Sequence, residues 1–130
     1  MLVTKETDYA VRCVVYLARE RNLVASVTEI AQQMRIPRTF LAKITQRLMR
    51  ENIVESVRGI NGGFRLLKNP EQLSLLEVFT AIQGIAPVSQ CAVDKRKCAM
   101  SSHCGVHPVW TKIRQEIEHR LAAHSISSLT

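Results

Sequence analysis

The apolar pattern changes its period within residues 26–67, and this change limits the fold more than any other feature. Two segments with helical spacing come first and are separated at Pro37, and a β-prone stretch that leads into Asn61 and Gly62 follows. Proline disfavours a helical residue before it but is tolerated at a helix start, so one helix ends and another begins there. Asn-Gly is a strong hairpin signal. We therefore predict two short helices followed directly by a two-stranded ribbon.

Capping residues mark the start of a helix at the beginning of this region and of another helix after it. Residues 4–20 place apolar side chains on one helix face, and Ser26 with Glu29 forms a capping box that opens the next helix. Ser74 and Glu77 form a second capping box that opens another short helix. Aromatic residues make up only 5% of the chain, so an aliphatic core and a helical fold are expected. The predicted fold class is mainly α with a small β-hairpin.

A last long helix is predicted to begin at Pro108, and it carries an apolar stripe. The members of the stripe are Trp110, Ile113, Ile117 and Leu121. Their spacing of three, four and four residues resembles the seam between paired helices. We expect the stripe to pair with a second copy of the chain, and packing on its own domain is the alternative. Residues 125–130 are expected to fray.

Most of the basic charge lies around the helix pair and the hairpin. The whole chain has a net charge of +7, and eight basic against two acidic residues between Arg35 and Lys68 give that stretch +6. A localised basic stretch suits the phosphate backbone of a nucleic acid, and a solvated basic face is the alternative for charge alone. Together with its charge, this order of elements predicts a winged helix-turn-helix that binds DNA.

The side chains expected to meet DNA follow from that prediction, because the second helix of the motif lies in the major groove. On this helix we expect contacts from Arg38, Thr39, Lys43 and Arg47. On the hairpin, which is the wing, we expect contacts from Arg58, Asn61, Gly62 and Arg65. The glycines allow the backbone to approach a phosphate or a groove closely. An ordinary tight hairpin with incidental arginines is the alternative.

Three of the four cysteines lie in an irregular segment, residues 85–107. Six residues separate Cys91 from Cys98, five separate Cys98 from Cys104, and His107 follows three positions later. Thiolates suit zinc, copper(I) and iron–sulfur clusters, and structural zinc normally uses more closely spaced pairs. The spacing therefore favours an iron–sulfur cluster. Structural zinc and a metal-free thiol redox switch on the same cysteines are the alternatives.

Other classes of protein find little support in the sequence. No apolar run is long enough to cross a bilayer, and residues 1–6 lack a signal-peptide core, so a cytoplasmic location without membrane partners is expected. Cys13 lies on the apolar face of the first helix and is expected to be a small core residue. We expect no enzyme, because the chain has neither a phosphate-binding glycine loop nor a defined base beside a cysteine.

Three features of the sequence carry a resemblance to a known family. They are the string LVTKETDYA at residues 2–10, the wing strings SVRG at 56–59 and GGFRL at 62–66, and the three spaced cysteines. In these features the chain resembles the IscR/NsrR-type bacterial regulators, the Rrf-two family, over nearly its whole length. The triple cysteine is typical of the branch that binds an iron–sulfur cluster.

The resemblance implies a homodimeric transcription regulator, repressor or activator, that binds a roughly palindromic DNA operator. It also implies that a 2Fe-2S or 4Fe-4S cluster controls operator affinity and senses iron–sulfur status, nitric oxide or redox stress. His107 matches the fourth cluster ligand of IscR-like members, and Asp8 matches the ligand that the partner subunit supplies in NsrR-like members. We favour His107 because it is local to the cysteines.

These expectations divide the chain into three parts. Residues 1–84 form the winged helix-turn-helix, residues 85–107 form the cluster-binding loop, and residues 108–130 form the dimerisation helix and its tail.

Overall fold

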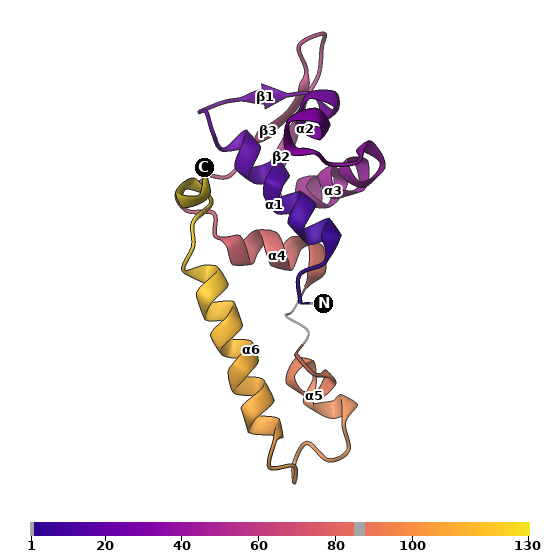
Figure 1. Ribbon diagram of the computed structural model, residues 1–130, viewed down its shortest axis with the longest axis vertical. Coiled ribbons are helices and arrows are strands. Elements are labelled where there is room, and N and C mark those ends of the chain that lie inside the picture. Colours follow the sequence, from indigo (N-terminus) through magenta and orange to yellow (C-terminus); the bar gives the residue numbers. More distant parts are fainter. Residues whose placement is uncertain (1, 85–87) are drawn as a thin grey trace.

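The computed structural model describes residues 2–84 and 88–130. Its elements are α1 (Lys5–Leu17), β1 (Val24–Ala25), α2 (Val27–Met34), α3 (Arg38–Arg50), β2 (Val54–Val57), β3 (Gly63–Leu66), α4 (Leu75–Gln83), α5 (Gln90–Val93), the 3-10 turn η1 (Lys95–Lys97), α6 (His107–Ala122) and the 3-10 turn η2 (Ile126–Leu129). Helices α1 to α4 and the strands gather in one body, from which α6 and α5 extend (Figure 1). The fold is mainly α with a small antiparallel sheet, as predicted, and is a winged helix-turn-helix.

The helix pair begins and ends where the sequence predicts. Ser26 caps α2 by accepting a hydrogen bond from the Glu29 N–H at 3.1 Å, but only this half of the predicted capping box forms, because the Glu29 carboxylate turns to another partner. The Glu29 carboxylate accepts a hydrogen bond from the Tyr16 hydroxyl at 2.7 Å, which ties α2 to α1 and raises the pKa of Tyr16. Helix α2 ends at Met34, and its C-cap residue Arg35 has a left-handed conformation with φ of 53°. Helix α3 starts directly after Pro37.

The wing contains one more strand than the hairpin that the sequence predicts. Strands β2 and β3 pair antiparallel, and Glu55 lies opposite Arg65. The two-residue strand β1 adds to the other edge of β3, with Ala25 opposite Phe64, so the strand order is β1-β3-β2. Two residues are too few to show the alternating pattern of a strand, and the sequence therefore does not predict β1.

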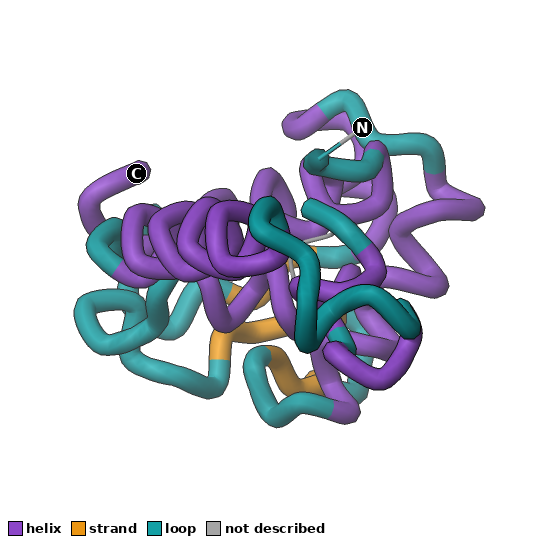
Figure 2. Tube along the Cα trace, turned by 90° about the horizontal axis from the view of Figure 1, so that it is seen from below, coloured by secondary structure: helices purple, strands orange, loops and turns teal. Residues whose placement is uncertain are grey.

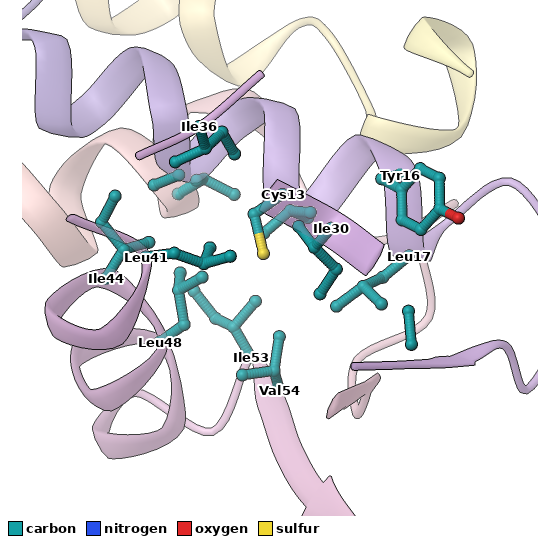
Figure 3. Packing of buried hydrophobic residues seen from close by; sticks show 14 of the residues in the cluster. Cys13, Tyr16, Leu17, Ile30, Ile36, Leu41, Ile44, Leu48, Ile53 and Val54 are labelled. Atoms are coloured by element: carbon teal, nitrogen blue, oxygen red, sulfur yellow. The ribbon is translucent and has the colours of Figure 1, made fainter. Parts of the chain in front are cut away.

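An aliphatic core anchors the helix pair and the wing to α1. Figure 3 shows Leu41 and Leu48 of α3 pointing toward Cys13 of α1 and Ile53, which precedes the wing. Cys13 is fully buried among these groups, and this burial raises the pKa of its thiol to about 12. The prediction that Cys13 is a core residue is confirmed.

The C-terminal residues return to the body, so the prediction that residues 125–130 fray was wrong. Ile126 is fully buried, and its N–H donates a hydrogen bond to the Leu73 carbonyl at 2.8 Å. The Leu75 N–H, at the start of α4, donates to the His124 carbonyl at 2.8 Å. A single isoleucine among serines is a weak sequence signal, but its burial fixes the tail beside α4.

Helix α6 lies against α4 and α5, and it has no buried residue in the single chain. Figure 2, seen from below, shows the helices in front of the small sheet.

The cysteine segment, residues 85–107, is less irregular than expected, because it contains α5 and η1. Its first residues, 85–87, lie outside the described residues. The proposed boundary after residue 84 falls at the edge of this gap, so the three-part division stays a prediction. Among the described residues, none of the helices combines the length and apolarity needed to cross a bilayer.

Candidate DNA-binding surface and cysteine segment

The recognition helix, α3, is fixed by one face and exposes the other. Leu41, Ile44 and Leu48 are buried in the core. Thr45 is also buried, and its hydroxyl donates a hydrogen bond to the Leu41 carbonyl at 2.9 Å. The structure exposes all four predicted DNA contacts of α3, of which Arg38, Thr39 and Lys43 lie on its outer face. Helix α3 therefore presents two cations and a hydroxyl from a rigid support.

Arg47 lies differently from the other predicted contacts of α3, because its guanidinium has partners within the chain. Its Nη1 donates a hydrogen bond to the Ile82 carbonyl of α4 at 3.0 Å and lies 3.3 Å from Oε2 of Glu6 in α1. Its side chain is 46% exposed. The contact of Arg47 with DNA stays a prediction, since its Nη1 already has these two partners.

The tip of the wing, residues 58–62, is a tight turn that depends on glycine. The Gly62 N–H donates to the Gly59 carbonyl at 3.0 Å, and Gly59 has a φ of 114°. A Cβ on Gly62 would lie 2.2 Å from the Val57 carbonyl oxygen, so the turn excludes any side chain there. Two predicted DNA contacts, Arg58 and Asn61, are exposed on this turn.

Ile60 lies between these two residues and is fully exposed. The sequence prediction did not include it, because a lone apolar residue in a turn gives no signal by itself.

Arg65 lies on the body of the wing rather than at its tip. Its Nε donates a hydrogen bond to Oε1 of Glu55, its cross-strand partner, at 2.9 Å. Cross-strand pairs of opposite charge stabilise a hairpin, and these side chains are 39% and 37% exposed. A contact of Arg65 with DNA stays a prediction, since the guanidinium already has this partner.

The three cysteines of the segment are free thiols at intermediate exposure. Cys91 lies on α5, where its Sγ is 3.3 Å from the Ser89 hydroxyl, while Cys98 directly follows η1. Cys104 lies ahead of α6. Within residues 2–84 and 88–130, no three Cys, His, Asp or Glu side chains lie close enough to hold one metal ion. The chain thus brings these ligand types into one segment without closing them around a centre.

His107, the first residue of α6, has an unsatisfied ring nitrogen. Its backbone N–H donates to the Cys104 carbonyl at 3.3 Å, which places it one turn beyond that cysteine. Its Nδ1 is buried and has no hydrogen-bond partner in the described part of the chain. Buried polar atoms normally have a partner, so this nitrogen is open to a partner that the described residues do not supply.

Asp8, the alternative fourth ligand, has a partner in its own helix. Its carboxylate lies 2.7 Å from the Arg12 guanidinium in an i,i+4 ion pair of α1, and its side chain is 50% exposed. Exposed pairs of this kind contribute little to stability, so the carboxylate stays available to another partner.

The apolar stripe of α6 is only partly covered in the single chain. Trp110 is 37% exposed, and Ile113, Ile117 and Leu121 are half-buried. Polar residues of α6 are also half-buried, and the buried Thr111 hydroxyl has no hydrogen-bond partner among the described residues. The helix therefore lacks the packing that a long amphipathic helix normally has on one face.

Comparison with known proteins supports these observations. A family model named Rrf2 and described as an iron-dependent transcriptional regulator matches residues 3–130. The HTH-type transcriptional regulator NsrR of Bacillus subtilis is 32% identical over 111 residues, which cover 84% of this chain and 76% of that protein. HTH-type regulators of this kind bind DNA and belong to a class without enzymatic activity.

Two solved structures share the fold. CymR, the global cysteine regulator of B. subtilis, aligns with a TM-score of 0.80 at 20% identity over 100% of this chain and 98% of CymR. IscR of T. potens aligns with a TM-score of 0.76 at 21% identity over 99% and 85% of the two chains. The family match over nearly the whole length, the relative above 30% identity and the shared fold agree: this chain is a member of the Rrf2 family of DNA-binding transcriptional regulators.

Proposed function

We propose that this regulator binds DNA as a homodimer and that an iron–sulfur cluster on Cys91, Cys98 and Cys104 controls its affinity. The observation that carries the proposal is the buried Nδ1 of His107, which has no hydrogen-bond partner within residues 2–84 and 88–130 and lies one turn beyond the last of three free thiols. Three soft thiolates and one imidazole form a donor set that suits such a cluster. The family description as iron-dependent agrees with this donor set.

The chain's own residues must rearrange to complete the site, since the described ligands do not yet converge. Metal binding often couples to local folding in this way. Cys91 would have to move together with α5. Cys98 and Cys104 would have to move together with the loop between η1 and α6. When bound, the cluster supplies a redox-active centre whose loss or modification is the signal: iron–sulfur status, nitric oxide or redox stress.

On the DNA side, the proposal assigns Arg38, Thr39 and Lys43 to the major groove, because α3 exposes all three. Arg58, Asn61 and the backbone at Gly62 would meet the minor groove or the phosphates from the wing tip. Arg65 would join them after leaving Glu55, whereas Arg47 would keep its bonds to Glu6 and Ile82. The exposed polar and basic side chains thus provide both base contacts and phosphate contacts.

Anaerobic purification tests the cofactor. We expect a coloured protein with visible absorption, iron and near-stoichiometric acid-labile sulfide, and loss of all three signals in Cys98→Ser and Cys104→Ser. Cys13→Ala is the matched control, because this buried thiol lies in the core and is expected to leave the cluster intact. Colourless protein containing one zinc would support structural zinc and contradict the proposal.

A metal-free thiol switch is the second candidate, because all three cysteines are free, half-buried thiols. It predicts a metal-free protein in which oxidation joins two of these cysteines and alters DNA affinity. Mass spectrometry of the oxidised protein, with and without a reductant, distinguishes it from the cluster.

The two candidate fourth ligands are separable by substitution. If His107 completes the site, His107→Ala destabilises the cluster or changes its absorption spectrum, whereas Asp8→Asn behaves as wild type. The opposite result would assign the role to Asp8 of the partner subunit and leave the three-cysteine proposal intact.

The incompletely covered α6 supports the homodimer. One chain has a mass of 14.7 kDa, and light scattering after size exclusion should give twice that value. Ile117→Asp places a charge in the stripe and should produce monomers, while Gln115→Asp, at an exposed position of the same helix, should not. A monomeric wild type, or a dimer that tolerates Ile117→Asp, would contradict pairing through α6.

A further inference from the structure

The last turn of α4 is bonded to the recognition helix. The carbonyl of Ile82 is one of the final carbonyls of α4, which lack partners within the helix. Arg47 of α3 donates to this oxygen at 3.0 Å, and Glu6 of α1 lies on the same guanidinium nitrogen at 3.3 Å. A cation at the C-terminal end of a helix is also favoured by the helix dipole. One side chain thus joins three helices.

The next residue, Gln83, bonds the same turn to the start of α1. Its Oε1 accepts hydrogen bonds from the Thr7 hydroxyl at 2.8 Å and from the Thr4 N–H at 3.2 Å. Its Nε2 donates to the Leu2 carbonyl at 2.5 Å. Thr7 is buried, so part of this network is shielded from water. Figure 1 shows the N-terminal end of the chain beside the end of α4.

The position of this turn in the chain gives the network its significance. Residue 83 ends α4, and the cysteine segment begins two residues later. A hydrogen bond fails once its atoms separate beyond about 3.5 Å. A shift of the last turn of α4 that carries the Ile82 carbonyl beyond this distance from the guanidinium would release Arg47 from Ile82.

We infer that Arg47 and Gln83 are positioning residues that transmit the state of the cysteine segment to the recognition helix: Arg47 fixes α3 against the last turn of α4, and Gln83 fixes the same turn against the start of α1. This inference rests on the proposed function, which makes that segment the sensor. Arg47 follows the buried Ile44 by three positions and so lies at the border of the exposed face of α3. This placement and its two partners suit a structural bond better than a phosphate contact.

Salt dependence of DNA binding separates these two roles for Arg47. A lost phosphate contact lowers the slope of log K against log salt by about one. In the cluster-free protein, Arg47→Gln should weaken binding and leave the slope unchanged. Lys43→Gln, the control on the exposed face, should lower the slope by about one. A slope for Arg47→Gln that falls like that of Lys43→Gln would overturn the positioning role.

The transmission itself is measured as the ratio of DNA affinities between cluster-loaded and cluster-free protein. We expect a wild-type ratio in the usual allosteric range of about 5–150-fold. Arg47→Lys and Gln83→Ala should each reduce this ratio to less than about two, so that the two forms bind DNA almost equally. Arg47→Lys keeps the charge and would still serve a phosphate contact, so it isolates geometry from charge. Circular dichroism and thermal unfolding check that both variants keep the fold.

The failures of the two proposals differ. A wild-type ratio that both variants retain would overturn the transmission role and leave the cluster sensor in place. Equal DNA affinities of cluster-loaded and cluster-free wild type would overturn both the cluster sensor and the transmission role. In that case the slope of log K against log salt for cluster-free Arg47→Gln would still decide whether Arg47 positions α3.

Discussion

At the scale of single residues, the pairing of β1 with the wing depends on Gly63. Gly63 has a φ of 152°, and a Cβ there would lie 2.1 Å from the carbonyl oxygen of Ala25 in β1. Gly63→Ala should therefore separate β1 from β3 and lower the free energy of unfolding by about 1–3 kcal/mol. Urea denaturation measures this change. Gly105→Ala, where a Cβ meets nothing within 4 Å, should change stability by less than about 0.5 kcal/mol. Equal stabilities of the two variants would contradict the steric argument.

The four cysteines should also differ in reactivity. The thiolate is the reactive form, and burial holds the pKa of Cys13 at about 12. Iodoacetamide at pH 8 should therefore modify Cys91, Cys98 and Cys104 of the cluster-free native protein and leave Cys13 unmodified. Mass spectrometry of tryptic peptides reads out the result. Unfolding in urea should expose the fourth site, and modification of Cys13 before the other three would show that the core is open.

At the scale of elements, α4 depends on its complete capping box. The Ser74 hydroxyl accepts from the Glu77 N–H at 3.2 Å, and the Glu77 carboxylate accepts from the Ser74 N–H at 2.9 Å. That hydrogen bond from the backbone, helped by Lys68, lowers the pKa of Glu77. Ser74→Ala should cost about 1 kcal/mol in the free energy of unfolding at pH 7.

The sign of the pH dependence follows from the lowered pKa of Glu77. The stability contributed by its carboxylate is present above the ordinary glutamate pKa of about 4.3 and is lost as pH falls through the lower folded-state value. The stability difference between wild type and Glu77→Gln should therefore shrink between pH 6 and pH 3. Urea denaturation across this range tests it, with the exposed Glu71→Gln as control. A difference that stays constant would mean that the carboxylate does not cap α4.

Elements with local signals were predictable from the sequence, and those fixed by distant contacts were not. Ser26, Pro37 and Ser74 mark helix starts through rules that act within four residues, and the structure confirms them. Strand β1 exists only because β3 offers it an edge. The tail is ordered because Ile126 is buried beside Leu73, 53 positions earlier in the chain, and no local pattern reports such a contact.

The same distinction applies to the candidate sites. Charge and position along α3 correctly place Arg38 and Lys43 on an exposed face. They do not report that Arg47 reaches Ile82, because that partner is distant in sequence. The spacing of the cysteines predicts a common segment, but the closure of their thiols around one centre depends on chain movements that spacing does not encode.

At the scale of the whole molecule, helices α5 and α6 extend from the body formed by α1 to α4 and the strands (Figure 1). The body is held by a continuous aliphatic core, whereas α6 has no buried residue in the single chain. Regions with few buried apolar contacts are the ones that open or move most readily. This asymmetry allows the extension to change state while the winged helix stays folded.

The central claim is that the cluster on the cysteine segment controls DNA affinity. The most direct measurement is fluorescence anisotropy under anaerobic conditions, with duplexes selected from a random pool by the cluster-loaded and by the cluster-free protein. At one fixed salt concentration, we predict that the two forms bind the same selected duplex with Kd values that differ by at least about fivefold. The difference should vanish in Cys98→Ser. Equal Kd values for loaded and cluster-free wild type on every selected duplex would contradict the account.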